Sequence, residues 1–416
     1  MTRRTAGARP RAELDVKTTR ADPQPADFTD VRATNLAVVL RHLRAHGPSS
    51  RAAIAASTGL NKATVSSLTG DLIRQRLLRE TGLSGNRIGR PGTALALDGS
   101  AYAAIGLQVS ADRLTALAVD FAGDQLLLWH RAFDGEPATT GAGRAVSAIA
   151  ALAQRAATRV RRQGRQVLGL TVAVPGLVAD GGTVRLSPPL GWSDVDLRGL
   201  LSGSLRQPGL DVAVANHAGL AAVAELRYGG HQVELDLTYV SGAAGVEAGI
   251  VVDGRLLHGS RGFTGQIGRF ALGAAGSPTL QDLAGVEPLV RRALPGFDPE
   301  SLTDLAPAVE QVATQARSGD PGTLAALGDT GRHLGQGLAL LANLVNPELI
   351  VLGDHYAALA EWLIPAAEAE LTRNTLAPDA GGVRLTASGL GLHAAALGGA
   401  VSHLDRVDTG SLPPKR

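Results

Sequence analysis

Apolar residues near the start of the chain recur at intervals of three and four, the spacing that places side chains on one face of an α-helix. A first amphipathic helix is predicted at 31–45 from the apolar positions Leu36, Val39, Leu40 and Leu43. A second helix follows at 51–58. A third begins at 62 and carries an apolar stripe of Val65, Leu68 and Leu72. The pattern therefore predicts helix, tight turn, helix after the first helix.

Residues that favour helix ends mark these boundaries. Ser50 and Asn61 are predicted caps, because their side-chain oxygens accept a bond from an otherwise unpaired backbone N–H. Gly59 is the predicted exit of the second helix, since glycine accepts the left-handed conformation. Two strands are then predicted, at 77–81 and 93–97, and the loop between them is basic. This order predicts a winged helix.

The third helix turns one cation and several short polar side chains away from its apolar stripe, which suits the major groove of DNA. The alternative is a helical hairpin with a solvated face, but Arg87 and Arg90 in the loop favour DNA, because a minor groove attracts arginine. Ser50 and Arg51 are expected to set the register on the backbone. The predicted DNA-binding residues are Ser50, Arg51, Asn61, Lys62, Thr64, Ser66, Ser67, Arg87 and Arg90.

Short apolar runs alternate with helical stretches from Tyr102 onward. Strands are predicted at 103–109, 114–119, 167–174, 212–215, 237–240, 249–252 and 349–353. Helices are predicted at 142–162, from 218 to 228, across 279–344, and at 357–372 and 391–404. This alternation predicts an α/β body. We expect disordered tails at 1–30 and 406–416, where no apolar period is found.

Charge is uneven along the chain, although the total is only +2. Residues 31–92 hold ten Arg or Lys and two acidic residues, a formal charge of +8. The remainder of the chain is acidic, so a phosphate-binding unit is joined to a body of opposite sign. The chain has no cysteine, which excludes disulfides and Cys-ligated zinc. No apolar run reaches the roughly 18 residues of a membrane span, and the N-terminus lacks a signal core, so a cytoplasmic protein is expected.

Several motifs together resemble the ROK family of bacterial sugar kinases and sugar-responsive repressors. They are Val174–Val178, Leu190–Trp192, Asp253–Leu256, Gly259–Gly268, Leu334–Ala339 and Leu344–Gly353, and, in the winged helix, Arg51, Lys62–Ser66 and Gly89–Pro91. The resemblance implies a winged helix at 31–98 and, at 99–405, a two-lobed α/β effector and oligomerisation body of the actin/hexokinase (ribonuclease H-like) type. It implies a transcriptional regulator that binds a double-stranded DNA operator as a homodimer or homotetramer.

The kinase machinery of the resembled family is altered in this chain. Its Asp-x-Gly-Gly-Thr phosphate turn corresponds to 108–112, which has no glycine for close backbone approach. Its catalytic Asp corresponds to His217. Glu247 stands in the second phosphate loop, where a carboxylate opposes phosphate. An ATP-dependent sugar kinase is therefore the alternative, and a regulator without catalytic residues or cofactor is the prediction.

The sugar site implied by the resemblance is altered as well. The family's Glu and zinc-binding His correspond to Gln266 and Arg269, and a loop that holds cysteine in the family has none here, so no metal is expected. The predicted ligand-binding residues are Asn216, His217, Gln266, Arg269 and Gln281. Three alternatives stay open for the effector: a sugar or sugar phosphate, another small molecule, or none.

Overall fold

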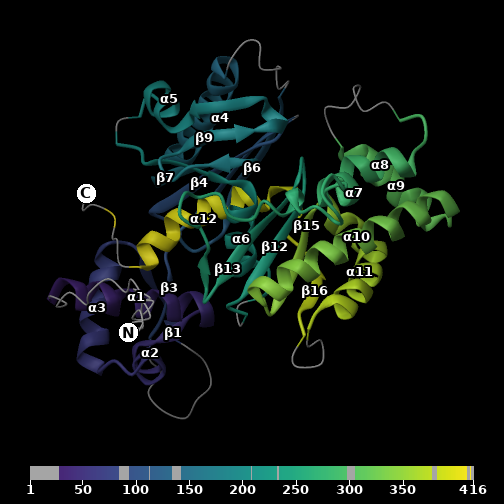
Figure 1. Ribbon diagram of the computed structural model, residues 1–416. Helices are drawn as coiled ribbons and strands as arrows, with labels where there is room; N and C mark the ends of the chain where they lie inside the picture. Colours follow the sequence, from purple (N-terminus) through teal and green to yellow (C-terminus); the bar gives the residue numbers. More distant parts are fainter. Residues whose placement is uncertain are drawn as a thin grey trace, which may run out of the picture.

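The computed structural model describes residues 28–83, 93–111, 113–133, 142–207, 209–231, 234–297, 305–376, 382–409 and 413. The chain has three parts (Figure 1): a head formed by residues 28–97, a first lobe and a second lobe, and each lobe is built on a five-stranded sheet. Among the described residues, no helix combines the length and the apolar character needed to cross a bilayer.

The head is the predicted winged helix. Its elements are α1 (Phe28–His46), β1 (Ser49–Ser50), α2 (Arg51–Thr58), α3 (Lys62–Arg74), β2 (Leu78–Leu83) and β3 (Thr93–Leu97). Both predicted caps are confirmed: the Ser50 hydroxyl accepts the N–H of Ala53 at 3.2 Å, and the Asn61 side chain accepts the N–H of Thr64 at 2.7 Å. Gly59 ends α2 with a φ of 73°. The strands pair in the order β1-β3-β2.

The two large sheets repeat one topology. The first contains β4 (Tyr102–Val109), β5 (Arg113–Asp120), β6 (Gln125–Ala132), β7 (Gln166–Val174) and β11 (Val212–Asn216) in the order β11-β7-β4-β5-β6. The second contains β12 (Leu237–Gly242), β13 (Val246–Val252), β14 (Arg255–Leu256), β15 (Leu349–Asp354) and β16 (Arg384–Ala387) in the order β14-β13-β12-β15-β16. In each, the first strand pairs antiparallel with the second and parallel with the fourth.

This repeat explains where a ligand site can form. Parallel strands place their carboxyl ends at one edge of a sheet, and open α/β sheets bind ligands beyond that edge. In the first lobe β4, β7 and β11 end there, and in the second lobe β12, β15 and β16 do. A smaller sheet of β8 (Leu177–Val178), β9 (Thr183–Ser187) and β10 (Trp192–Asp196) follows β7 in the chain.

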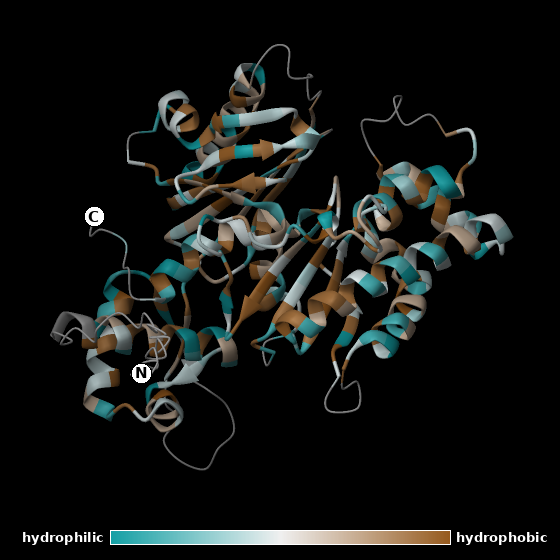
Figure 2. Cartoon of the chain, viewed as in Figure 1, coloured by the Kyte–Doolittle hydropathy of each residue, from teal (hydrophilic) through white to brown (hydrophobic). Residues whose placement is uncertain are grey.

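Helices cover the sheets in layers. The first lobe carries α4 (Gly143–Arg162) and α5 (Leu197–Ser204), and the second carries α7 (Leu280–Ala284), α8 (Val286–Ala293), α9 (Ala306–Arg317), α10 (Pro321–Val345) and α11 (His355–Asn374). Between the lobes lie α6 (His217–Tyr228) and α12 (Ala394–Asp408), which pack on each other. Figure 2 shows apolar residues along the central strands of both sheets, where these helices cover them.

Close packing of α12 depends on glycine. A Cβ at Gly106 of β4 would overlap the carbonyl oxygen of Ala396, and one at Gly398 would overlap the carbonyl oxygen of Leu220 on α6. Both neighbours are backbone atoms that cannot move aside as a side chain can. Glycine at these two positions therefore lets α12 lie directly on the first sheet and on α6.

The head joins the body through the end of α12, which runs toward α1 in Figure 1. Arg44 of α1 donates from Nε to Oδ2 of Asp408 at 2.5 Å and from Nη2 to Oδ1 at 3.2 Å. The same guanidinium lies over the ring of Phe121, 5.3 Å from its centroid. Apolar residues of the head share one core with Leu404 and Val407.

The structure corrects both expected tails where they meet the described chain. The first helix begins at Phe28, three residues before the expected start, and residues 1–27 lie outside the described chain. The last helix continues to Asp408, where the body was expected to end at 405. It continues because Val407 and Asp408 are buried against the head, a contact that no local pattern reveals.

Several strands were not predicted from the sequence. These are β1, β6, β8, β9, β10, β14 and β16. Two of them, β14 and β16, are edge strands of two and four residues, too short for an alternating pattern. In β6, which is also an edge strand, the apolar residues 126–129 run consecutively but only Leu127 is buried, so no alternating pattern marks the strand.

Candidate functional site

Helix α3 of the head has one fully buried face. Val65, Leu68 and Leu72 lie in the core shared with α1 and α12. The side chains of Lys62, Ser66 and Ser67 are exposed, and Thr64 is half-buried at the edge between the two faces. The predicted separation of apolar and polar positions on this helix is therefore present in the structure.

Three other predicted DNA-contacting residues, Ser50, Arg51 and Asn61, make hydrogen bonds within the head. The side-chain oxygens of Ser50 and Asn61 cap the helices. Arg51 donates from Nε to the Thr69 hydroxyl at 3.2 Å and from Nη2 to Glu80 at 3.0 Å, and this ties α2 to α3 and β2. Contact between Arg51 and a phosphate would exchange one of these partners. Arg87 and Arg90, predicted in the wing, lie outside the described residues.

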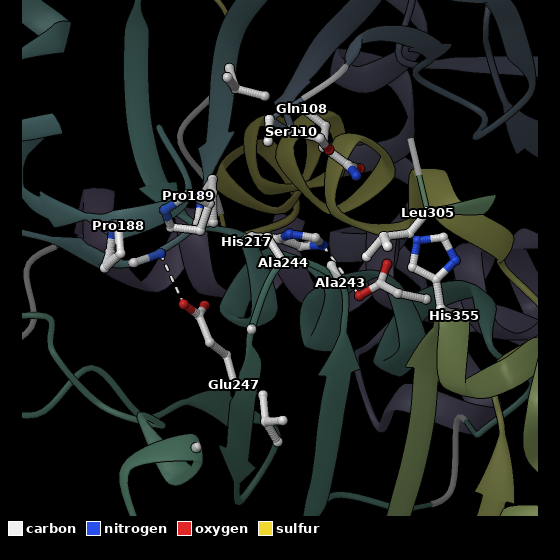
Figure 3. A pocket seen from close by; sticks show the side chains of 18 of the residues that line it. Gln108, Ser110, Pro188, Pro189, His217, Ala243, Ala244, Glu247, Leu305 and His355 are labelled. Atoms are coloured by element: carbon white, nitrogen blue, oxygen red, sulfur yellow. Dashed lines mark hydrogen bonds and ion pairs between the residues drawn. The ribbon is translucent and has the colours of Figure 1, made fainter. Parts of the chain in front are cut away.

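A cleft of about 830 Å³ opens between the lobes at the carboxyl ends of the parallel strands. Four of the predicted ligand residues line it: His217 at the start of α6, Gln266, Arg269 and, on α7, Gln281. Figure 3 shows His217, Ala243, Ala244 and Glu247 gathered around the cavity. The structure thus brings together residues separated by more than sixty positions in the chain.

Asn216, the fifth predicted residue, does not line the cleft among the residues that the structure describes. Its side-chain oxygen accepts the N–H of Gly219 at 3.0 Å and so caps α6. Its amide donates to the carbonyl of Gly176 and to Oε2 of Glu247, both at 2.8 Å. These contacts use both donor hydrogens of the amide and one lone pair of its oxygen. Asn216 therefore positions other residues in this structure.

Glu247 on β13 lines the cleft. From the sequence it was interpreted only as a carboxylate that would repel a bound phosphate. Its carboxylate accepts the N–H of Gly176 at 2.9 Å as well as the Asn216 amide, and so links the second lobe to the first. Burial raises the pKa of Glu247, and the hydrogen bond from Asn216 and the charge of His217 partly oppose that rise. The sequence signal was the replacement of a small residue by a carboxylate in a loop of small residues.

His217 forms a buried pair with Asp354, which sequence reasoning missed. The Nε2 atom of His217 lies 3.4 Å from Oδ2 of Asp354, and the Ser241 hydroxyl donates to the same oxygen at 2.6 Å. Burial alone lowers the pKa of His217, but the charge of Asp354 outweighs it, and the pKa is raised. The pKa of Asp354 is lowered, since His217 and Ser241 outweigh its burial. Each partner therefore favours the charged form of the other.

The backbone at Asp354 supports a specific role for its carboxylate. Its φ of 52° and ψ of −128° lie in a region that favours glycine. Its side chain makes no cap for α11 and instead points to His217 and Ser241. Strained conformations of this kind persist where surrounding structure holds them, and they cluster at functional sites.

The first lobe contributes a polar wall of its own. Gln108 at the end of β4 donates from Nε2 to the carbonyl of Leu392 at 2.9 Å, and the Thr115 hydroxyl lies 3.1 Å from Nδ1 of His130. All four residues line the cleft. In the described part of the chain, no three His, Asp or Glu side chains are placed to hold a metal ion. The cleft can therefore bind a polar molecule through its own side chains.

Comparison with known proteins decides the family. The pattern that defines the ROK family matches residues 104–405, more than half of the chain, and that of the IclR helix-turn-helix domain matches residues 33–82. The chain belongs to the ROK family.

Relatives with known roles place this ROK protein among the regulators. It is 25% identical to the xylose repressor of Bacillus spizizenii over 379 residues, covering 90% of this chain and 95% of the repressor. It is 26% identical to the DNA-binding transcriptional dual regulator NagC of Escherichia coli over 358 residues, covering 83% and 86% of the two chains.

A solved structure agrees with this assignment at the level of the fold. It is the crystal structure of a ROK family transcriptional regulator described as a homologue of the E. coli Mlc protein. Its TM-score is 0.74 at 22% identity, and the match covers 92% of this chain and 98% of that one. The protein is a DNA-binding transcriptional regulator of the ROK family and not an enzyme.

Proposed function

We propose that this ROK regulator reads its operator with the exposed face of α3. The main support is that Lys62, Ser66 and Ser67 are exposed on a helix whose opposite face is fully buried. A helix of this kind fits the major groove, where serine hydroxyls reach base edges and lysine pairs with phosphate. Thr64 lies at the edge of the contact, and Arg87 and Arg90 extend it into the adjacent minor groove.

The regulator acts as a symmetric oligomer. Two heads related by a two-fold axis contact successive major grooves, so the operator is a pseudo-palindrome with half-sites about one helical turn apart. Helix α3 has one exposed polar face and one buried apolar face, which supports contact of each head with one major groove. A homodimer is sufficient for this geometry, and a homotetramer would present two such pairs.

The interlobe cleft binds a sugar or a sugar derivative that changes operator affinity. Support comes from the four ligand residues that line the cleft, and from relatives named for xylose and N-acetylglucosamine. A ligand that binds one arrangement of the lobes better than the other shifts the equilibrium between them. Through α12, which begins beside Leu392 of the cleft and ends at Arg44 of the head, that shift changes the position of α3.

Operator selection from a random-sequence duplex library tests the DNA contact, followed by fluorescence anisotropy on the selected duplex. Lys62→Ala is expected to weaken binding and to reduce the slope of log affinity against log salt by about 1, because one phosphate contact is lost. The matched control is Arg161→Ala, an exposed cation at the end of α4. Equal affinity and equal salt slope for the two variants would overturn the proposed surface.

A further inference from the structure

Gln108, which lines the cleft, carries an unpaired hydrogen-bond acceptor. Its side chain is 5% exposed, and its Nε2 is committed to the carbonyl of Leu392 at 2.9 Å. Its Oε1 is buried and has no protein partner. Figure 3 places Gln108 on the side of the cavity opposite Ala243 and His355. A buried carbonyl oxygen without a donor costs free energy, and a ligand that donates a hydrogen bond to Oε1 of Gln108 would recover that cost.

The opposite wall also carries acceptors. Glu247 and Asp354 hold carboxylates there, and both line the cleft. A phosphate group consists of acceptors only and cannot pair with any of these oxygens, whereas a hydroxyl donates as well as accepts. The guanidinium of Arg269 supplies a donor on the same cleft. Walls that offer both kinds of group match a molecule rich in hydroxyls.

The size of the cleft points beyond a single sugar ring. Its volume of about 830 Å³ lies toward the upper end of the roughly 300–1,000 Å³ of clefts that hold drug-sized ligands. Its lining comes from both lobes and includes Pro188, Gln281, Gln108 and Leu392. Apolar side chains, Leu177, Leu186 and Leu392 among them, separate the polar groups and suit the apolar faces of sugar rings.

We infer that the cleft takes a neutral disaccharide, with one ring beside Glu247, Gln266 and Arg269 and a hydroxyl of the second ring donating to Oε1 of Gln108. This inference rests on the proposed effector role of the cleft and names the ligand class. Because Gln108 also holds the carbonyl of Leu392 just before α12, the second ring contacts the residue that joins the first lobe to that helix. Monosaccharides fill only the first half of the site.

Isothermal titration calorimetry on the full chain tests the inference. The probes are maltose, cellobiose, xylobiose and sucrose, then glucose and xylose, and finally glucose 6-phosphate. At least one disaccharide is expected to bind ten or more times more tightly than its own monosaccharide and more tightly than the phosphate. A monosaccharide that binds as tightly as every disaccharide, or a phosphate that binds best, overturns the inference and leaves the proposed effector role standing. Binding of none of these probes, with operator binding intact, overturns both.

A pair of variants tests the side chain of Gln108. Gln108→Met keeps the length of the side chain and removes Oε1 together with the Nε2 donor to Leu392, and Gln163→Met makes the same change at the end of α4, outside the cleft lining. Gln108→Met is expected to weaken disaccharide binding about tenfold and to leave monosaccharide binding unchanged, while Gln163→Met changes neither. Equal weakening of both ligand classes by Gln108→Met contradicts the assigned contact. Should Gln108→Met fail to fold, the ligand comparison on the natural chain decides alone.

Discussion

Arg44 and Asp408 form an ion pair between the head and the body. Replacing Arg44 and replacing Asp408 should destabilise this junction to different degrees. The Asp408 side chain is 1% exposed and the Arg44 side chain 17%. Arg44→Met leaves a carboxylate buried without a counterion. Asp408→Asn leaves a guanidinium that still reaches water, the Phe121 carbonyl at 3.3 Å and the Phe121 ring. The arginine variant should therefore be the more damaging one.

The magnitude follows from the burial of each partner. Breaking a buried ion pair by removing one side costs about 3–5 kcal/mol, and the near-complete burial of Asp408 places Arg44→Met in that range. Asp408→Asn removes charge from bonds that contribute about 1.5–3 kcal/mol each when one partner is charged. It keeps a polar side chain, so a loss of about 2 kcal/mol is expected.

Hydrogen–deuterium exchange of α1 and the last turns of α12 is the suitable assay, because a chain of several domains does not unfold as one unit. A loss of about 3 kcal/mol in local opening free energy speeds exchange by about 100-fold. Arg332→Met, which removes a half-exposed ion pair with Asp329, serves as control and should change exchange little. Unchanged exchange in Arg44→Met, or a larger effect from Asp408→Asn, would refute the reasoning.

Three further variants probe other parts of the body. The pKa of His403 is lowered to about 4, chiefly by burial. Between pH 6.5 and 4 the unfolded chain therefore binds a proton at this histidine that the folded chain does not bind. The free energy of unfolding decreases by about 3 kcal/mol as the pH is lowered through this range. His403→Gln should flatten the melting temperature between pH 7 and 4.5, and an unchanged slope argues against this. Asp354→Gly relieves the positive φ but removes the counterion, so the pKa of His217 should fall in an NMR titration; an unshifted pKa contradicts the pair. Gly106→Val should separate α12 from the first sheet and lower the melting temperature by several degrees, which a calorimetric scan with an unaltered transition would disprove.

The elements that the sequence predicted well are those governed by neighbouring residues. Ser50, Gly59 and Asn61 act on backbone groups within four positions, so the helix-turn-helix follows from local chemistry. The long central strands also followed, because they are buried on both faces and read as continuous apolar runs, as at 102–109. The edge strands β14 and β16 did not: β14 has only two residues, and β16 pairs with β15, which lies about 35 positions earlier in the chain.

The candidate site divides in the same way. Four of the five residues expected from the resemblance to the family's motifs line the cleft. The sequence did not show that both amide hydrogens of Asn216 are engaged, or that Glu247 links the two lobes. Those facts depend on Gly176, which lies 40 positions from the asparagine in the chain.

By itself, the sequence determined a basic winged helix, an α/β body and the replacement of kinase residues, since composition, periodicity and motifs are properties of adjacent positions. Only the tertiary structure decided that His217 faces Asp354, that the acceptor of Gln108 is left unpaired beside the cleft, and that the head is tied to the last helix at Asp408. These pairs are joined by the repeated sheet topology, which brings the carboxyl ends of distant strands to one place. No local propensity encodes which distant groups will meet there.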